Sequence, residues 1–415
     1  MKFAHMADCH LGGWSDPVLS DINIECFEKA MEICIVEKVD FILISGDLFD
    51  RSMPSFEVME RTVSKIREVR DRGIRVYVIA GSHDFSPTGK TMLKVFEKAG
   101  LFTGVSKRRE TKDNKLSLLF TTDEKTGAKI TGLVGKMGVL ETKYYELLDR
   151  ESLANEKGFK IFMFHTALTE LKPEIYEYAE GMPISLLPEG FDYYAGGHVH
   201  QHARHNWNNY GPIVFPGPTM PVNFRELEHL GTGGFYINTV ESGKVETEWK
   251  PLSLYDVELI SIDANDRNPS SVMSEIEKRI GPALKDKIVL LRIEGTLKAG
   301  KPTDIDLRRI TSMMNEQGAK TVKKNLSKLA SAEYQEIKVT ASSREELEDK
   351  LIVEHAGHLK MKGIDKKKEV SLTKKLITTL VDSRSPDEKK KDYQARMESD
   401  ILTILGIKEE WEEFA

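Results

Sequence analysis

VYVIAGSHDFSPTG, residues 76–89, joins an apolar run to a group of polar side chains. The run is rich in β-branched and aromatic residues and ends at Gly81, which is typical of a buried strand. Ser82, His83 and Asp84 follow directly. This stretch therefore predicts either a polar turn after a strand or one part of a metal site, and the rest of the chain must decide between them.

Similar apolar runs recur over residues 1–250, namely KFAHMA, VDFILISG, RVYVIAG, KITGLVG, KIFMFH, FDYYAGG, PIVFPG and GGFYINT. Most are bounded by Gly or Pro, as buried strands are. Amphipathic stretches at 22–38 and 56–72 separate the early runs. The alternation predicts a layered α/β domain in which helices cover the strands.

A polar motif follows an apolar run at four further places in this region. These motifs contain Asp8 with His10, Asp47, His165, and His198 with His200. Residues two apart in an extended chain point to the same face, so Asp8 pairs with His10, and His198 with His200. Ligand sites in sheets with helical crossovers gather beyond the carboxyl ends of the strands. The five motifs are therefore expected to meet in one place.

The residue types in these motifs are those that bind Mn, Fe, Zn or Mg. They are too many for one ion and suit two ions about 3.5–4 Å apart, the arrangement that hydrolyses phosphoesters. Each motif alone has an ordinary explanation: Asp8-x-His10 as a surface pair, Gly46-Asp47 as a turn, or His165 as a core histidine. Five such motifs at the ends of apolar runs are better explained by a dinuclear metal site.

The 415 residues suffice for two or three domains, and 40% hydrophobic with 30% charged residues fits a globular protein. The net charge of −6 does not indicate a general nucleic-acid binder, so any DNA contact must use local basic patches. No apolar stretch approaches the ~20 residues that cross a bilayer, and the N-terminus turns polar too early for a signal peptide. We expect a cytoplasmic protein with Cys9, Cys26 and Cys34 as reduced thiols.

Composition and periodicity divide the rest of the chain. Residues 251–340 contain helical stripes in SSVMSEIEKRI and TDIDLRRITSMMNEQG around a strand, DKIVLLRIEG, which predicts a small α+β domain. Residues 341–415 contain a Lys-rich linker and two helices at 370–381 and 387–405. Two helices rarely bury a core by themselves. They either dock on another protein or pack back on this chain.

In this order, the motifs D-x-H, G-D, G-S-H-D, H and G-H-x-H resemble the calcineurin-like metallophosphoesterase superfamily. MKFAHMADCHLG, DFILISGDLFDRSMPS and YAGGHVHQ are similar to one branch, the SbcD-type nucleases of double-strand-break repair, the meiotic-recombination-eleven family. The resemblance is strong over 1–250 and moderate over 251–340. It implies an α/β (α+β) fold: a four-layer sandwich of two mixed sheets flanked by helices, a small α+β capping domain and a C-terminal helical segment.

The resemblance also implies roles for the motif residues. Asp8, His10 and His200 would hold one metal ion, His165 and His198 the other, and Asp47 would bridge both, with His83 as the catalytic histidine and Asp84 orienting it. Family members typically prefer manganese. Most have Asn where this chain has Ser82, and the Asn oxygen ligates the second ion. Ser82 either ligates directly or through water, leaves a weaker second site, or abolishes catalysis.

Further roles follow from the resemblance and from local composition. The candidate DNA contacts are Lys107, Arg108, Arg109, Arg308, Arg309, Lys320, Lys323, Lys324 and Lys328, with 223–225 at the rim of the site; the alternative is a solvated surface. The candidate dimer contacts are Met59, Val95 and Phe96, which would otherwise be core residues. The candidate contacts to an SbcC-type ATPase, the radiation-fifty partner, are Leu376, Leu380, Met397, Ile401 and Leu405.

The leading hypothesis is a metal-dependent DNA exonuclease and endonuclease that works with an ATPase in double-strand-break repair. A phosphoesterase of the same fold that acts on nucleotides or phosphoproteins is the nearest alternative. A non-catalytic scaffold that holds DNA ends and recruits the ATPase is an alternative of another class, and Ser82 is the feature that favours it.

Overall fold

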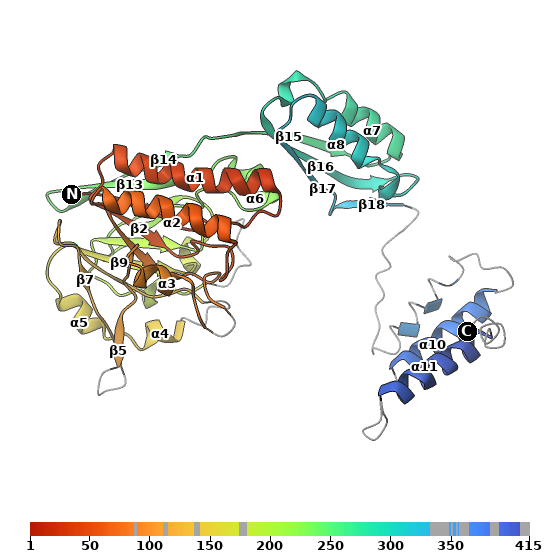
Figure 1. Ribbon diagram of the computed structural model, residues 1–415, viewed down its shortest axis with the longest axis horizontal. Coiled ribbons are helices and arrows are strands. Elements are labelled where there is room, and N and C mark those ends of the chain that lie inside the picture. The colour runs from red at the N-terminus through yellow and green to blue at the C-terminus, as the bar shows by residue number, and fades with distance from the viewer. Residues whose placement is uncertain are drawn as a thin grey trace. The chain divides into compact units, whose positions relative to one another are not determined.

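The computed structural model describes residues 1–86, 89–110, 115–136, 142–173, 181–332, 348–349, 352–353, 356, 365–381 and 390–406. The chain divides into two compact units, Met1–Glu333 and Tyr334–Ala415, which are treated separately here. Figure 1 shows the elements of both units. None of the helices in the described part of the chain has the length and apolar character needed to cross a membrane.

The first sheet is six-stranded and mixed, in the order β14-β13-β1-β2-β3-β4. Its strands are β1 (Lys2–Met6), β2 (Phe41–Ser45), β3 (Arg75–Ile79), β4 (Thr103–Gly104), β13 (Gly234–Glu241) and β14 (Lys244–Pro251). The strands β1 to β4 run parallel because crossover helices connect them, namely α1 (Pro17–Val36), α2 (Phe56–Asp71) and α3 (Leu93–Lys98). The carboxyl ends of these strands therefore lie at one edge of the sheet.

The second sheet is also six-stranded and mixed, in the order β11-β12-β10-β9-β8-β7. Its strands are β7 (Thr121–Thr122), β8 (Lys129–Gly132), β9 (Lys160–His165), β10 (Tyr193–Gly197), β11 (Ala203–His205) and β12 (Ile213–Phe215). The central strands β8, β9, β10 and β12 run parallel, and the two edge strands are antiparallel. Around this sheet lie α4 (Thr142–Glu146), α5 (Arg150–Asn155) and a hairpin of β5 (Arg108–Glu110) and β6 (Leu116–Leu118). The helix α6 (Phe224–Leu230) instead joins the core beneath α1 and α2 through Leu227.

The two sheets face each other across a layer of large apolar side chains. On β2, Phe41 and Leu43 belong to this inner layer, whereas Ile42 and Ile44 belong to the core beneath α1 and α2. A strand covered on both faces is apolar throughout, which explains the unbroken FILIS run. The outer face of the second sheet has its own core, which includes Tyr145 of α4. The predicted four-layer sandwich is confirmed (Figure 1).

A third sheet follows, with β15 (Asp256–Asp263), β16 (Lys287–Leu297), β17 (Thr321–Asn325) and β18 (Leu329–Ser331). Every pairing in it is parallel, and α7 (Pro269–Glu277) and α8 (Leu307–Glu316) connect the strands. The sequence predicted an α+β domain here; the alternation of strand and helix gives an α/β unit instead. Ile288 and Leu290 join the core beneath α1, so this sheet packs within the first compact unit. The domain boundary at residue 250 stays a prediction.

Short 3-10 turns occur at Thr169–Leu171, Ile184–Leu186, Pro282–Leu284 and Pro302–Asp304. The C-terminal unit contains α10 (Lys366–Val381) and α11 (Lys390–Leu405), which pack against each other. Leu376, Met397 and Ile401 are half-buried, while Leu380 and Leu405 are exposed. The sequence SPDE at 385–388, which is typical of a capping box, lies outside the described residues. The contact with an ATPase stays a prediction.

The candidate dimer residues differ in their surroundings. Phe96 is only 5% exposed and packs among core aromatic rings, so the prediction that it is an exposed contact is wrong. Met59 is half-buried against the same core, and Val95 is exposed. Met53 and Phe56, which the sequence analysis did not select, are 70% and 89% exposed just before and at the start of α2. Whether each of these apolar side chains is buried or exposed therefore depends on where it lies on or beside the helix and not on its residue type.

Candidate metal centre

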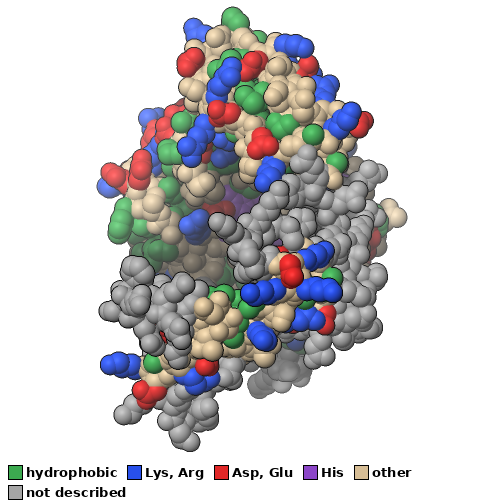
Figure 2. Space-filling view, turned by 90° about the vertical axis from the view of Figure 1, so that its right-hand side faces the viewer, with side chains coloured by type: hydrophobic (Ala, Val, Ile, Leu, Met, Phe, Trp, Pro, Cys, Tyr) green, Lys and Arg blue, Asp and Glu red, His purple; other side chains and the backbone are tan. Residues whose placement is uncertain are grey.

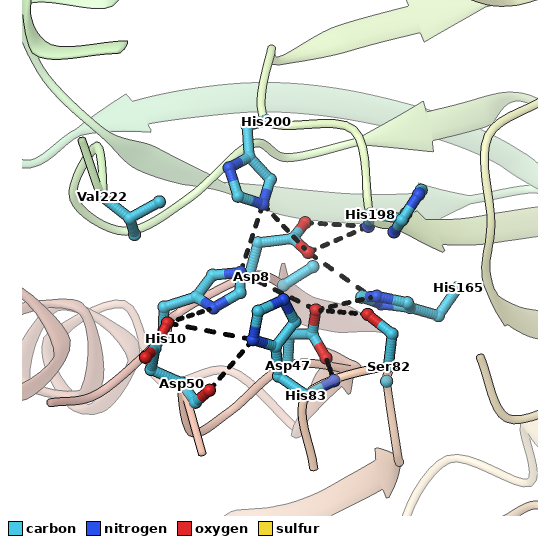
Figure 3. Close-up of polar contacts among 12 residues, drawn as sticks. Asp8, His10, Asp47, Asp50, Ser82, His83, His165, His198, His200 and Val222 are labelled. Atoms are coloured by element: carbon cyan, nitrogen blue, oxygen red, sulfur yellow. Dashed lines mark hydrogen bonds and ion pairs between the residues drawn. The ribbon is translucent and has the colours of Figure 1, made fainter. Parts of the chain in front are cut away.

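The carboxyl ends of five strands meet at one place, and each supplies a polar side chain (Figure 3). Asp8 and His10 follow β1, Asp47 follows β2, Ser82 and His83 follow β3, His165 ends β9, and His198 and His200 follow β10. Several of these residues have left-handed backbone, with φ of 53° at Asp8, 42° at His10 and 50° at Asp47. Such backbone is unfavourable for non-glycine residues and is concentrated at functional sites.

Hydrogen bonds between neighbouring loops hold this unfavourable backbone. The backbone N–H of Asp8 donates to Gly46 O at 3.1 Å, and that of His10 donates to Asp47 O at 3.0 Å. Glycines make room for the site: a Cβ on Gly46 would lie 2.2 Å from His165 Nδ1, and one on Gly81 would lie 2.2 Å from Asp47 Oδ1. The glycines that end the strands therefore allow the polar side chains to pack directly on backbone.

Asp47 lies at the middle of the cluster. Its Oδ2 is 3.1 Å from His165 Nε2, 3.7 Å from His10 Nε2 and 3.3 Å from Ser82 Oγ. Two groups of potential ligands overlap here, Asp8 with His10 and His200, and Asp8 with Asp47 and His165. Within each group the ligand atoms lie within 4.8 Å of one another. The arrangement fits two neighbouring cations.

Three histidines, His10, His165 and His200, direct Nε2 into the cluster. Their Nδ1 atoms face acceptors: His165 Nδ1 lies 2.8 Å from Ser45 O, and His200 Nδ1 lies 3.0 Å from Glu226 Oε1. His10 Nδ1 lies 3.4 Å from Asp50 Oδ1, longer than a well-formed hydrogen bond. An acceptor at Nδ1 favours the tautomer whose Nε2 lone pair can bind a metal.

Charge in this cluster also suits a cation. Burial opposes ionisation of Asp47, but the imidazoles of His165 and His10 outweigh it and hold the pKa of Asp47 below its usual range. Burial likewise opposes a charged His165, but Asp47 and Asp8 outweigh burial and raise its pKa to about 10. The Nε2 atoms of His10 and His200 lie only 3.2 Å apart. Bound cations would replace protons as the partners of these carboxylates and nitrogens, so the residues fit a dinuclear site.

His198 lies differently from the other predicted ligands. Its side chain is exposed and points away from the cluster in Figure 3, although its ring centroid is 5.3 Å from that of His165. Its backbone N–H donates to both carboxylate oxygens of Asp8, at 2.9 and 3.1 Å. His198 thus positions Asp8 in this conformation, and its role as a ligand of the second ion stays a prediction.

Ser82 faces the cluster, as the sequence predicted for position 82. Its hydroxyl donates to Asp47 Oδ2 at 3.3 Å. The hydroxyl therefore lies beside the carboxylate that the resemblance assigns to both ions. Whether it ligates an ion stays a prediction.

His83 lies at the open side of the cluster, with its side chain 49% exposed. Its backbone N–H donates to Asp47 Oδ1 at 2.8 Å, and its Nδ1 donates to Asp50 O at 2.9 Å. Figure 2 shows some histidine colour (purple) that is visible from outside the molecule. His83 can therefore meet a bound substrate.

Asp84 does not orient His83, so that prediction is wrong. Its carboxylate accepts the backbone N–H groups of Gly81 at 2.9 Å and Phe49 at 3.2 Å, and the residue is 2% exposed. Asp84 thus fixes the loop after β3, and burial, with the nearby charge of Asp47, raises its pKa to about 7. Asp50 contacts both His83 and His10 instead. Its position three residues after Asp47, in GDLFD, was the available signal.

Glu226 was also missed by the sequence analysis. It is 8% exposed, and its carboxylate accepts from His200 Nδ1 at 3.0 Å, Asn223 Nδ2 at 2.6 Å and the backbone N–H of Val222 at 3.0 Å. Asn223 caps α6 by accepting the backbone N–H of Glu226 at 3.0 Å. The N-x-x-E pattern at 223–226 is related to a capping box and was the available signal.

The candidate DNA-binding residues do not form one patch. Lys107 and Arg109 are exposed, and the Arg108 guanidinium lies 4.3 Å from the ring centroid of Tyr144. Arg308, Lys320, Lys324 and Lys328 are exposed, and Arg309 forms an ion pair with Glu277 at 2.9 Å. Lys323 is half-buried, 5.5 Å from the Trp14 ring centroid, because alternation along β17 turns it away from Lys324.

Comparison with known proteins gives the class first. Residues 1–202 match the family described as calcineurin-like phosphoesterase. The two-sheet sandwich and the cluster at its strand ends lie in or beside the region that is similar to calcineurin-like phosphoesterases.

The particular relatives come from archaea and bacteria. "DNA double-strand break repair protein Mre11" of Methanopyrus kandleri is 30% identical over 284 residues, 62% of this chain and 59% of that protein. The protein of the same name from Archaeoglobus fulgidus is 24% identical over 334 residues, 75% of this chain and 71% of that protein. "Uncharacterized metallophosphoesterase YhaO" of Bacillus subtilis is 25% identical over 264 residues, 60% of each chain. The similarity to the Methanopyrus protein thus spans less than two thirds of its length.

Proposed function

We propose that this protein is a metal-dependent DNA nuclease, with exonuclease and endonuclease activity, that acts in double-strand-break repair. The observation that carries the proposal is the meeting of carboxylates and imidazoles from four strand ends in two overlapping groups of potential metal ligands, with Ser82 and His83 of a fifth strand end beside them. The names of the archaeal relatives support DNA as the substrate.

The proposed metal ligands rest on the two ligand groups, which have Asp8 in common, and on the place of Asp47 between His165 and His10. Asp8, His10 and His200 would hold one ion, and His165 the other, with Asp47 bridging both and with Ser82 and His198 as further candidates. Manganese is the ion that we propose. When bound, two divalent ions polarise a phosphodiester and make a water molecule acidic enough to attack it.

His83 would transfer the proton that the leaving oxygen needs. Its Nδ1 donates to Asp50 O, which leaves Nε2 as the atom that takes up and gives a proton. The bond from its backbone N–H to Asp47 holds this loop beside the cluster. Asp50 therefore acts as a positioning residue, through its carbonyl oxygen on His83 and its carboxylate near His10.

We also propose a homodimer and two macromolecular partners. DNA ends, hairpins and single strands would bind through Lys107, Arg108 and Arg109 and through the exposed Lys324 and Arg308. The exposed Met53, Phe56 and Val95 support a dimer surface on α2 and α3. The exposed Leu380 and Leu405 support the docking of α10 and α11 on an SbcC-type ATPase.

One set of reactions tests the activity. Purified protein is incubated with linear duplex, hairpin and single-stranded DNA and Mn²⁺, beside His83→Ala and a control, His229→Ala, which changes an exposed histidine on α6 outside the cluster. The proposal requires that the wild type and the control degrade DNA and that His83→Ala does not. Intact DNA binding without degradation would identify a scaffold, and turnover of mononucleotides alone would identify another phosphoesterase.

A further inference from the structure

A cavity of about 750 Å³ opens beside the metal centre. It lies where β3 and β8 end, with residues 78–80 on one side and Leu133 and Val134 on the other. Ser82 is part of its wall and also donates to Asp47. The cavity is therefore continuous with the site, and its volume is within the range of about 300–1,000 Å³ usual for small-molecule sites.

The walls of this cavity are mainly apolar and carry adaptable polar groups. Phe85, Leu93 and Phe102 line one side and belong to or pack against the core beneath α2. Hydroxyl groups are supplied by Ser82, Ser86, Thr91 and Ser106. Hydroxyls can donate or accept, so they do not demand one particular pattern on a ligand. Such walls suit a flat aromatic group with mixed polar edges.

The charged residues of the cavity favour an anionic ligand. Among the lining residues that the structure describes, Lys94, Arg108 and Lys136 are basic and Glu97 is acidic. The Glu97 carboxylate is engaged by the backbone N–H of Gly104 at 3.0 Å.

Tyr144 holds two of the cations together. The Arg108 guanidinium lies 4.3 Å from its ring centroid, and Lys136 Nζ donates to its hydroxyl at 2.7 Å. The guanidinium of Arg108 carries five N–H donors, so it can contact Tyr144 and still donate to a ligand. A basic rim of this kind beside an aromatic and aliphatic interior is the pattern that binds single-stranded nucleic acid.

We propose that this cavity binds one unstacked nucleobase of the DNA strand whose phosphate lies at the metal centre, with Lys94, Arg108 and Lys136 on neighbouring phosphates. The proposal rests on the proposed nuclease function. The base would leave its stack and contact Phe85 and Phe102, and the hydroxyls would accept any of the four bases. Unstacking costs least in a single strand or at a frayed end, so the cavity would select such substrates.

The base can be located with 2-aminopurine, whose emission rises when it leaves a stack. It is placed at successive positions of a single-stranded oligonucleotide, and the complex is formed with the full chain and EDTA so that no cleavage occurs. We expect emission to rise severalfold at one position and iodide to quench it less there. An abasic residue at that position should weaken binding about tenfold. Equal emission at every position, or no loss with the abasic strand, would overturn the proposal.

Variants link this response to the cavity. Val134→Trp fills it from a half-buried wall position, and Lys94→Glu reverses one exposed rim charge; Val36→Trp changes an exposed residue at the end of α1 as the control. Both cavity variants should lose the emission change, and the control should keep it. Lys94→Glu keeps the test decisive if Val134→Trp does not fold. A wild-type response in either folded cavity variant would refute the assignment.

Cleavage of the same oligonucleotide with Mn²⁺ separates this inference from the function on which it rests. Cleavage without a positional emission change would overturn the base-binding cavity and leave the nuclease proposal standing. Absence of cleavage by the wild type would overturn the nuclease proposal itself.

Discussion

Replacing Glu226 should weaken the binding of one of the two metal ions, although Glu226 is in neither ligand group. Its carboxylate accepts the Nδ1 hydrogen of His200 at 3.0 Å, and this bond directs Nε2 of His200 into the cluster. The same carboxylate is held by Asn223 and by the backbone of Val222, so its position is well defined. In Glu226→Ala, the imidazole loses its acceptor and can rotate or adopt the other tautomer.

The expected size of the effect follows from such buried contacts in general. Loss of an outer partner of a metal-bound histidine lowers metal affinity by about 10- to 100-fold, which corresponds to about 1.4–2.8 kcal/mol. Glu226→Gln keeps a neutral acceptor oxygen, and a neutral hydrogen bond is roughly half as strong as a charged one. We therefore expect a smaller loss for Gln, under about tenfold.

Calorimetric titration with Mn²⁺ measures both sites. In Glu226→Ala one site should weaken, and the other, built on Asp47 and His165, should keep its affinity. Glu228→Ala is the matched control, because Glu228 lies on the same helix but pairs with Arg292. If Glu226→Ala binds both ions as the wild type does, the Glu226 carboxylate does not position His200. Equal weakening in Glu228→Ala would show a general effect on α6 instead.

Three other predictions follow. Asp50→Ala keeps the carbonyl oxygen that accepts from His83 but removes the carboxylate 3.4 Å from His10 Nδ1, so it should weaken the Mn²⁺ site of His10 about 10- to 100-fold in the same titration, whereas unchanged affinity would contradict a positioning role for this carboxylate. Ser82→Asn should raise the affinity of the second Mn²⁺ site in the same titration, because the amide oxygen extends further beyond Asp47 than the serine hydroxyl does. Ser82→Ala should change this affinity less, and a larger change in Ser82→Ala than in Ser82→Asn would contradict the prediction. Burial lowers the pKa of His5 from 6.5 to about 3. A hydrogen bond to the backbone of Gly196 raises the pKa but offsets only part of the effect of burial, so His5 is neutral in the folded state. As pH falls from 6.5 towards 3, His5 of the unfolded state takes up a proton before His5 of the folded state does. The free energy of unfolding of the wild type should therefore fall by about 1.4 kcal/mol per pH unit more than that of His5→Gln. Denaturant unfolding curves that shift equally with pH in the wild type and in His5→Gln would contradict this.

Local sequence patterns were enough to predict most of the strands and the order of the polar motifs along the chain. Runs such as FILIS are apolar throughout because the strand is covered on both faces, so local composition was enough to find it. Parallel strands place their carboxyl ends together, so a polar motif after each run was enough to gather Asp8, Asp47 and His165. Asp8 and His10 do share one ligand group, but their left-handed backbone means that the alternation expected of an extended strand was not the reason.

Long-range contacts determine which side chains hold the metal ligands in position and which faces of the helices are buried. Glu226 reaches His200 across 26 residues, and Asp50 rather than Asp84 reaches His83, because the turn after each strand sets the direction of a side chain. Phe96 is buried because other core rings cover its side of α3. A local pattern gives the face on which a residue lies. What packs against that face depends on long-range contacts that no short stretch of sequence contains.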